Sequence, residues 1–147
     1  MTDTVEHRTS GRLAGPLPRT LRLVLRYRAD DPFAVSLHFA GPARLGAGLV
    51  VEDGGAVDDG PRWTVGRALL DTGSRQPAGL GDLRVRPMRD ETVRLEFHAP
   101  DGVAAFHLRG SDLRGFLAAT YRLVPPGTES DRIDWPDTAE EFAGRLF

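Results

Sequence analysis

Two histidines and a carboxylate lie close together on a predicted pair of strands. Glu96 and His98 alternate along one segment, and His107 lies in the next. If Asp101-Gly102 forms a two-residue hairpin turn, Glu96 lies directly opposite His107. Zinc accepts such ligands, but the spacing supplies no fourth one. We therefore interpret the three residues as part of a solvated sheet face with one weak ion pair, and we predict no metal site.

Other patterns that support catalysis are missing from the sequence. No serine stands in a G-x-S-x-G elbow, and a phosphate-binding P-loop is impossible because the chain has no lysine. The absence of cysteine excludes thiolate catalysis, disulfides and cysteine-bound metals. The paired carboxylates Asp30/Asp31, Asp58/Asp59 and Glu140/Glu141 fall in predicted turns or at a helix start. We therefore predict a protein that is not an enzyme, with no catalytic residue and no cofactor.

Arg84 and Arg86 alternate along a short predicted strand, so both point outward. Together with Trp63 they could bind single-stranded nucleic acid, because bases stack on aromatic rings beside basic grooves. The simpler interpretation is two solvent-exposed arginines and one core tryptophan. The net charge of −2 argues against nucleic acid, whose binding domains are usually basic. Arg84 and Arg86 are our candidate partner-binding residues.

The elements that position these side chains predict an α+β fold. Alternating apolar residues indicate a first hairpin with one buried face, on which Phe33 is the first residue of the second strand. In the second hairpin, the expected turn places Phe97 opposite Phe106 and Leu95 opposite Leu108. Strands are predicted over residues 21–27, 33–39, 62–65, 82–86, 92–99 and 103–109.

Two main helices are predicted, over residues 67–71 and 112–121. Gly73 is expected to end the first helix in a left-handed conformation, and Ser111 is expected to cap the second. The pattern Thr138-Ala-Glu-Glu141 resembles a capping box and predicts a short C-terminal helix.

The 147 residues fit one domain, which we place at residues 21–147. Residues 1–20 are polar and rich in glycine and proline, so we expect a flexible N-terminal tail. Residues 40–61 are rich in glycine and aspartate, and we interpret them as a loop insertion. No apolar run approaches the ~20 residues of a membrane helix, and the N-terminus lacks a signal-peptide pattern. We therefore expect a cytoplasmic protein without membrane insertion.

Six short patterns follow one another between residues 21 and 147. They are Asp31-Pro-Phe-Ala-Val35, Trp63-x-x-x-Arg67-Ala-Leu-Leu70, Arg75-x-Pro-x-Gly-x-Gly-Asp-Leu-Arg-Val85, Pro100-Asp-Gly102, Leu113-x-x-Phe-Leu117 and Val124-Pro-Pro-Gly-Thr-Glu129. Their order and spacing resemble those of the SsgA-like proteins, the sporulation-linked cell-division regulators of actinomycetes.

This resemblance implies curved antiparallel sheets with packed helices, similar to the whirly single-stranded nucleic-acid-binding proteins. It implies a homo-oligomer, expected to be a trimer, and a non-enzymatic scaffold or adapter in sporulation-specific cell division. Such a protein helps to select septum sites, to recruit the tubulin-like division ring and to guide local peptidoglycan synthesis. Its expected partners are the tubulin-like division GTPase or a paralogous SsgA-like protein, at division septa. The alternative is a single-stranded nucleic-acid-binding module of whirly-like fold.

Overall fold

A computed structural model of the chain describes residues 3–40, 60–100 and 102–133. Nearly all of the expected insertion at 40–61, and the predicted C-terminal helix, lie outside the described residues. The described elements are β1 (Thr4–Leu13), β2 (Arg19–Arg28), β3 (Ala34–Ala40), β4 (Arg62–Gly66), α1 (Arg67–Gly73), β5 (Leu83–Pro87), β6 (Thr92–Ala99), β7 (Gly102–Arg109), α2 (Gly110–Leu123) and a 3-10 turn, Glu129–Arg132.

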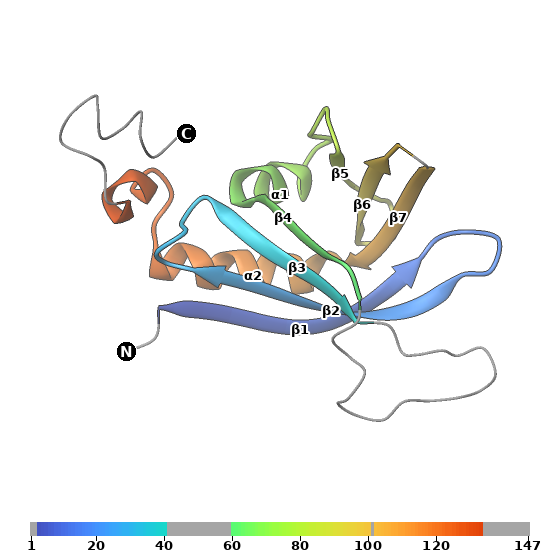
Figure 1. Cartoon of the computed structure of the whole chain (residues 1–147), viewed down its shortest axis with the longest axis horizontal. Helices are drawn as coiled ribbons and strands as arrows, with labels where there is room; N and C mark the ends of the chain where they lie inside the picture. Colours follow the sequence, from blue (N-terminus) through green and yellow to red (C-terminus); the bar gives the residue numbers. More distant parts are fainter. Residues whose placement is uncertain (1–2, 41–59, 101, 134–147) are drawn as a thin grey trace.

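The seven strands form one antiparallel sheet in the order β4-β3-β2-β1-β7-β6-β5 (Figure 1). The sheet curves so strongly that its two halves meet across the core. The Phe39 ring of β3 lies 5.0 Å from Phe106 of β7 and 5.6 Å from Phe97 of β6, between ring centroids. Trp63 of β4 lies 4.6 Å from the same Phe97 ring. The core therefore fills the inside of a nearly closed sheet.

Both helices contribute to this core. Helix α1 joins the two edge strands β4 and β5, and α2 runs along the inner side of the sheet (Figure 1). Leu70 of α1 is fully buried, as are Leu113 and Phe116 of α2. In the described part of the chain, neither helix is long and apolar enough to cross a bilayer. The α+β class, the antiparallel pairing and the two main helices are as predicted.

The expectation of a flexible N-terminal tail is wrong for residues 4–13. They form β1, which pairs with β2 along its whole length and with β7 through Gly11–Leu13. Strand β1 therefore joins the two halves of the sheet. Its inward positions are Val5, His7, Thr9, Gly11 and Leu13, and the three in the middle are polar or small, which hides the strand pattern. The inward Thr9 hydroxyl instead donates a hydrogen bond of 2.6 Å to Asp112 at the start of α2.

The second hairpin has a different register from the predicted one. Leu95 lies opposite Phe106, and Phe97 lies opposite Ala104. The shift of two residues keeps every side chain on its predicted face, because side chains alternate with a period of two. Phe97 therefore makes its aromatic contacts across the core, with Phe39 and Trp63.

Three local expectations also change. Phe33 precedes β3 in a turn and is 49% exposed. Gly73 is the last residue of α1, as expected, but it lacks the left-handed conformation and is buried against Val85. Helix α2 begins before Ser111, with Arg109 as the N-cap residue and no side-chain cap bond.

Candidate partner-binding face

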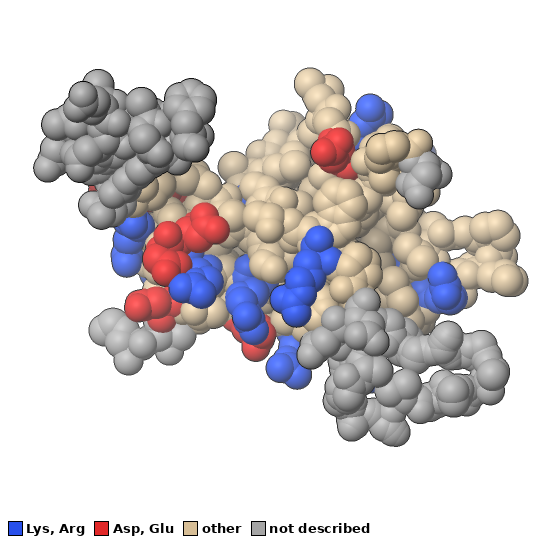
Figure 2. All heavy atoms as spheres, viewed as in Figure 1, with Lys and Arg blue, Asp and Glu red and all other residues tan. Residues whose placement is uncertain are grey.

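The outer face of the sheet carries most of the arginines of the strands. The register places even-numbered residues of β1 to β6 and odd-numbered residues of β7 on this face. Figure 2 shows arginine side chains next to one another over the strands of the visible face. The outward arginines are Arg8, Arg12, Arg22, Arg26, Arg28, Arg62, Arg84, Arg86, Arg94 and Arg109.

Carboxylates are scarce at the same outward positions. Within the described strands they are only Glu6 and Glu96. Glu6 forms an ion pair with Arg26, with 2.8 Å between carboxylate oxygen and guanidinium nitrogen, and Glu96 forms one with Arg94 at 3.0 Å. The overall charge of −2 therefore conceals a strongly basic sheet face.

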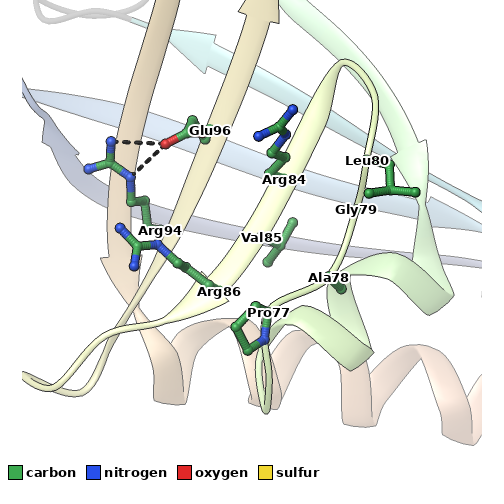
Figure 3. A pocket seen from close by; sticks show the side chains of 9 residues that line it. All are labelled: Pro77, Ala78, Gly79, Leu80, Arg84, Val85, Arg86, Arg94 and Glu96. Atoms are coloured by element: carbon green, nitrogen blue, oxygen red, sulfur yellow. Dashed lines mark hydrogen bonds and ion pairs between the residues drawn. The ribbon is translucent and has the colours of Figure 1, made fainter.

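Arg84 and Arg86 lie beside a pocket of about 470 Å³ on this face (Figure 3). Its far side is the loop before β5, which pairs with that strand: Ala78 N–H donates to Val85 O at 2.8 Å. Leu80 at the loop tip is 91% exposed. The pocket is lined by Pro77, Ala78, Gly79, Leu80, Arg84, Val85, Arg86, Arg94 and Glu96.

Gly79 lets the loop run this close to β5. Its φ is +100°, and a Cβ atom there would lie 2.3 Å from the carbonyl oxygen of Leu83. Only glycine satisfies both conditions. The loop therefore turns the chain and also forms one wall of a pocket beside two exposed arginines.

The Glu96 cluster forms an ion-pair network. One carboxylate oxygen of Glu96 accepts hydrogen bonds from Arg94, and the other lies 2.8 Å from His98 Nε2. These bonds, first with His98 and then with Arg94, lower the pKa of Glu96. His107 lies opposite Arg94, so the predicted pairing of Glu96 with His107 is wrong. Among the described residues, no group of three potential ligands could hold a metal ion.

A row of basic side chains crosses four adjacent strands on the outer face. Arg12 of β1 lies opposite His107 of β7, His107 opposite Arg94 of β6, and Arg94 opposite Arg86 of β5. We call Arg12, Arg94 and Arg86 the arginine row. Burial lowers the pKa of His107, and repulsion from Arg94, Arg12 and Arg86 adds to the effect against an opposing attraction from Asp90. These effects favour the neutral form of His107.

The titration of His107 tests this arrangement. We expect NMR to give His107 a pKa below the ordinary 6.5, and Arg94→Gln to raise it because the nearest cation is removed. Since the folded state holds the proton less well than the unfolded state, His107 costs stability as pH falls below 6.5. A His107 pKa above 6.5, or no rise in Arg94→Gln, would contradict the arrangement.

Trp63 does not share a surface with Arg84 and Arg86. It packs inward on Phe97, whereas the two arginines point outward from β5. The predicted core role of Trp63 and the exposure of both arginines are confirmed. Two arginines next to this pair were not predicted from the sequence: Arg12, which lies in the presumed tail, and Arg94 of β6.

A second polar cluster, missed by sequence reasoning, is buried inside the fold. Arg67 is 1% exposed and lies between the rings of Tyr27 and Tyr121, with its guanidinium carbon 4.8 and 4.3 Å from the ring centroids. It donates hydrogen bonds to the main-chain oxygens of Thr120 and Val124 at the end of α2, at 3.2 and 2.9 Å.

The Arg67 cluster also contains an ion pair with Glu129, at 2.7 Å. The bond from Arg67 is the largest cause of the lowered pKa of Glu129. Tyr121 donates a hydrogen bond to Asp71, and its pKa is raised to about 12 by burial and by that bond. The cluster ties α1, the end of α2 and the following turn together. Arg67 and Glu129 both occur in the short patterns that resemble the SsgA-like proteins. That was the only sequence signal that could have pointed to this cluster.

The comparisons with known proteins agree with this architecture. Residues 21–129 match the family described as "SsgA: Streptomyces sporulation and cell division protein, SsgA". The sporulation-specific cell division protein SsgB of Salinispora tropica is 41% identical, over 97% of this chain and 95% of that protein. SsgB of Frankia casuarinae is 39% identical, over 82% of this chain and 76% of its own length.

Two solved structures are similar to the chain. An SsgA-like sporulation-specific cell division protein from Thermobifida fusca has a TM-score of 0.74 and 30% identity, over 99% of each chain. SsgB from a study of longitudinal cell division during sporulation of Streptomyces coelicolor has a TM-score of 0.70 and 31% identity, over 88% of this chain and 94% of that one. The chain belongs to the SsgA-like family of sporulation and cell division proteins.

Proposed function

We propose that this protein is a non-enzymatic scaffold or adapter in sporulation-specific cell division, and that Arg84 and Arg86 belong to its partner-binding face. Its curated relatives are named sporulation-specific cell division proteins. In this role the protein helps to place the division ring and to guide local peptidoglycan synthesis at septum sites. The proposed partners are the tubulin-like division GTPase or a paralogous SsgA-like protein.

The observation that carries the proposal is the unused charge beside the pocket. Arg84 and Arg86 are exposed, and neither has a hydrogen bond or ion pair within the described residues. Arg86 also lies directly opposite Arg94, and like charges in that position destabilise a sheet. A bound ligand of negative charge would relieve this repulsion between Arg86 and Arg94. The proposed homotrimer and the whirly-like fold remain predictions.

The first test is localisation and recovery of partners in a sporulating host. A fluorescently tagged full chain is followed by microscopy, and division proteins that co-purify with it are identified. The proposal expects the tag to concentrate at septa and division proteins to be recovered. An even distribution throughout septation, together with no division protein recovered, would contradict it.

A double substitution that removes both charges tests whether Arg84 and Arg86 bind the division partner. We expect Arg84→Gln/Arg86→Gln to weaken binding of the division partner by about two- to thirtyfold, because each of the two charged contacts adds roughly 0.2–1 kcal/mol. Its stability should stay within about 0.5 kcal/mol of the parent chain, as for most surface changes. The matched control is Arg62→Gln, an exposed arginine of the same sheet face that lies on the opposite edge strand β4, outside the pocket and the arginine row. Equal loss in both variants would contradict the assignment.

A further inference from the structure

The arginine row extends the candidate face well beyond β5. Neighbouring strands lie about 4.8 Å apart, so Arg12 to Arg86 covers three spacings, or roughly 14 Å. Arg12 and Arg86 are exposed and have no polar partner within the described residues. Arg94 forms an ion pair with Glu96 at 3.0 Å. The row therefore presents two exposed guanidinium groups at its ends and, between them, one that is paired with Glu96.

The side chains of the row favour carboxylates as ligands. A guanidinium group is a planar fork that binds a carboxylate through two parallel hydrogen bonds. Leu80, which lines the same pocket as Arg86 and Arg94, adds a large exposed apolar side chain. An acidic peptide with interspersed apolar residues satisfies both features. About five residues of extended chain cover the ~14 Å of the row.

The same face is poorly suited to single-stranded nucleic acid. Base stacking on aromatic side chains supplies much of that binding. On the described strands, no phenylalanine, tyrosine or tryptophan occupies an outward position. Trp63 faces the core instead.

We propose that the arginine row, together with Leu80, binds an acidic peptide segment of the division partner in which carboxylates alternate with apolar side chains. The inference rests on the proposed adapter function and names the chemistry of its partner. Arg12 and Arg86 bind the carboxylates, and Leu80, in the loop beyond the edge strand β5, contacts an apolar side chain next to the carboxylate at Arg86, on the side away from Arg12. Glu96 keeps Arg94 in place and repels carboxylates that enter out of register.

Fluorescence anisotropy with the full chain tests this site directly. The probe is a labelled peptide of about eight residues in which glutamate alternates with leucine, long enough to cross the row. We expect binding at low salt that weakens as salt rises. Arg12→Gln/Arg86→Gln should weaken it about tenfold, Leu80→Ser about threefold, and Arg62→Gln less than twofold. A peptide with glutamine in place of glutamate should not bind.

Three results would overturn the inference. The first is no binding of the acidic peptide at low salt, and the second is equal weakening by Arg12→Gln/Arg86→Gln and by Arg62→Gln. The third is tighter binding of an oligothymidine than of the peptide, with the same dependence on Arg12 and Arg86, which would assign the face to nucleic acid. If the tagged chain still concentrates at septa and recovers division proteins, any of these results removes the peptide site and leaves the adapter function intact.

Discussion

Replacement of Arg67 by methionine is expected to lower the free energy of unfolding by about 3–5 kcal/mol, the usual cost of breaking a buried ion pair. Methionine keeps much of the side-chain volume but removes every donor. Glu129 then loses its cation, and the carbonyl oxygens of Thr120 and Val124 lose a charged donor. Since a domain of this size has only about 5–15 kcal/mol of stability, a large share is lost.

Urea denaturation followed by circular dichroism measures this effect. The matched control is Arg75→Met, which removes an exposed arginine paired with Asp71 at i,i+4 and should cost at most about 0.5 kcal/mol. A loss below about 1 kcal/mol in Arg67→Met would show that the buried cluster does not hold α1 to α2.

The ion pair between Arg67 and Glu129 also makes the folding stability depend on pH, with a loss of stability at low pH. The pKa of Glu129 is lowered in the folded state, chiefly by Arg67, so its contribution to stability is present above the ordinary value of 4.5. It is lost as pH falls through the lower folded pKa, when the carboxylate takes up a proton. We therefore expect the stability difference between the parent chain and Glu129→Gln to shrink as pH falls below 4.5.

The second large effect concerns two glycines in helices. Gly73→Ala should destabilise the protein by about 1–3 kcal/mol, because its Cβ would lie 2.3 Å from two carbons of Val85 and force the helix away from β5. Gly115→Ala should instead stabilise by about 0.5–1 kcal/mol, because nothing lies within 4 Å of its Cβ position on the exposed side of α2.

Thermal or urea unfolding of the two variants separates packing from helix propensity. Propensity alone predicts that both substitutions stabilise, so opposite signs are the expected result. Val85→Ala in the Gly73→Ala background should recover part of the loss by clearing the contact. Stabilisation by Gly73→Ala alone would contradict the close packing of α1 against β5.

The strands with a strict alternation of apolar and polar residues were predictable from the sequence. Leu23, Leu25 and Leu37 are fully buried, as the period of two requires. Strand β1 was not predictable in this way, because its inward face carries Thr9 and His7, whose contacts are with Asp112 on a helix more than a hundred residues later. Polar contacts across the core leave no local pattern.

The outward pair Arg84 and Arg86 was also predictable, since alternation along one strand fixes the face. The row that contains Arg86 was not, because it depends on which strands are neighbours and on their register. Arg12 and Arg86 are brought onto one line only by the order β1-β7-β6-β5. The buried role of Arg67 was hidden for the same reason, since its acceptors lie at the far end of α2.

The most direct test of the account is quantitative microscopy of the full chain in a sporulating host, with equal expression of the parent, Arg84→Gln/Arg86→Gln and Arg62→Gln, each carrying the same fluorescent tag. We predict that the parent and Arg62→Gln concentrate at septa, whereas Arg84→Gln/Arg86→Gln remains folded but spreads through the cell. Septal concentration of the double variant equal to that of the parent would contradict a partner-binding role for this face.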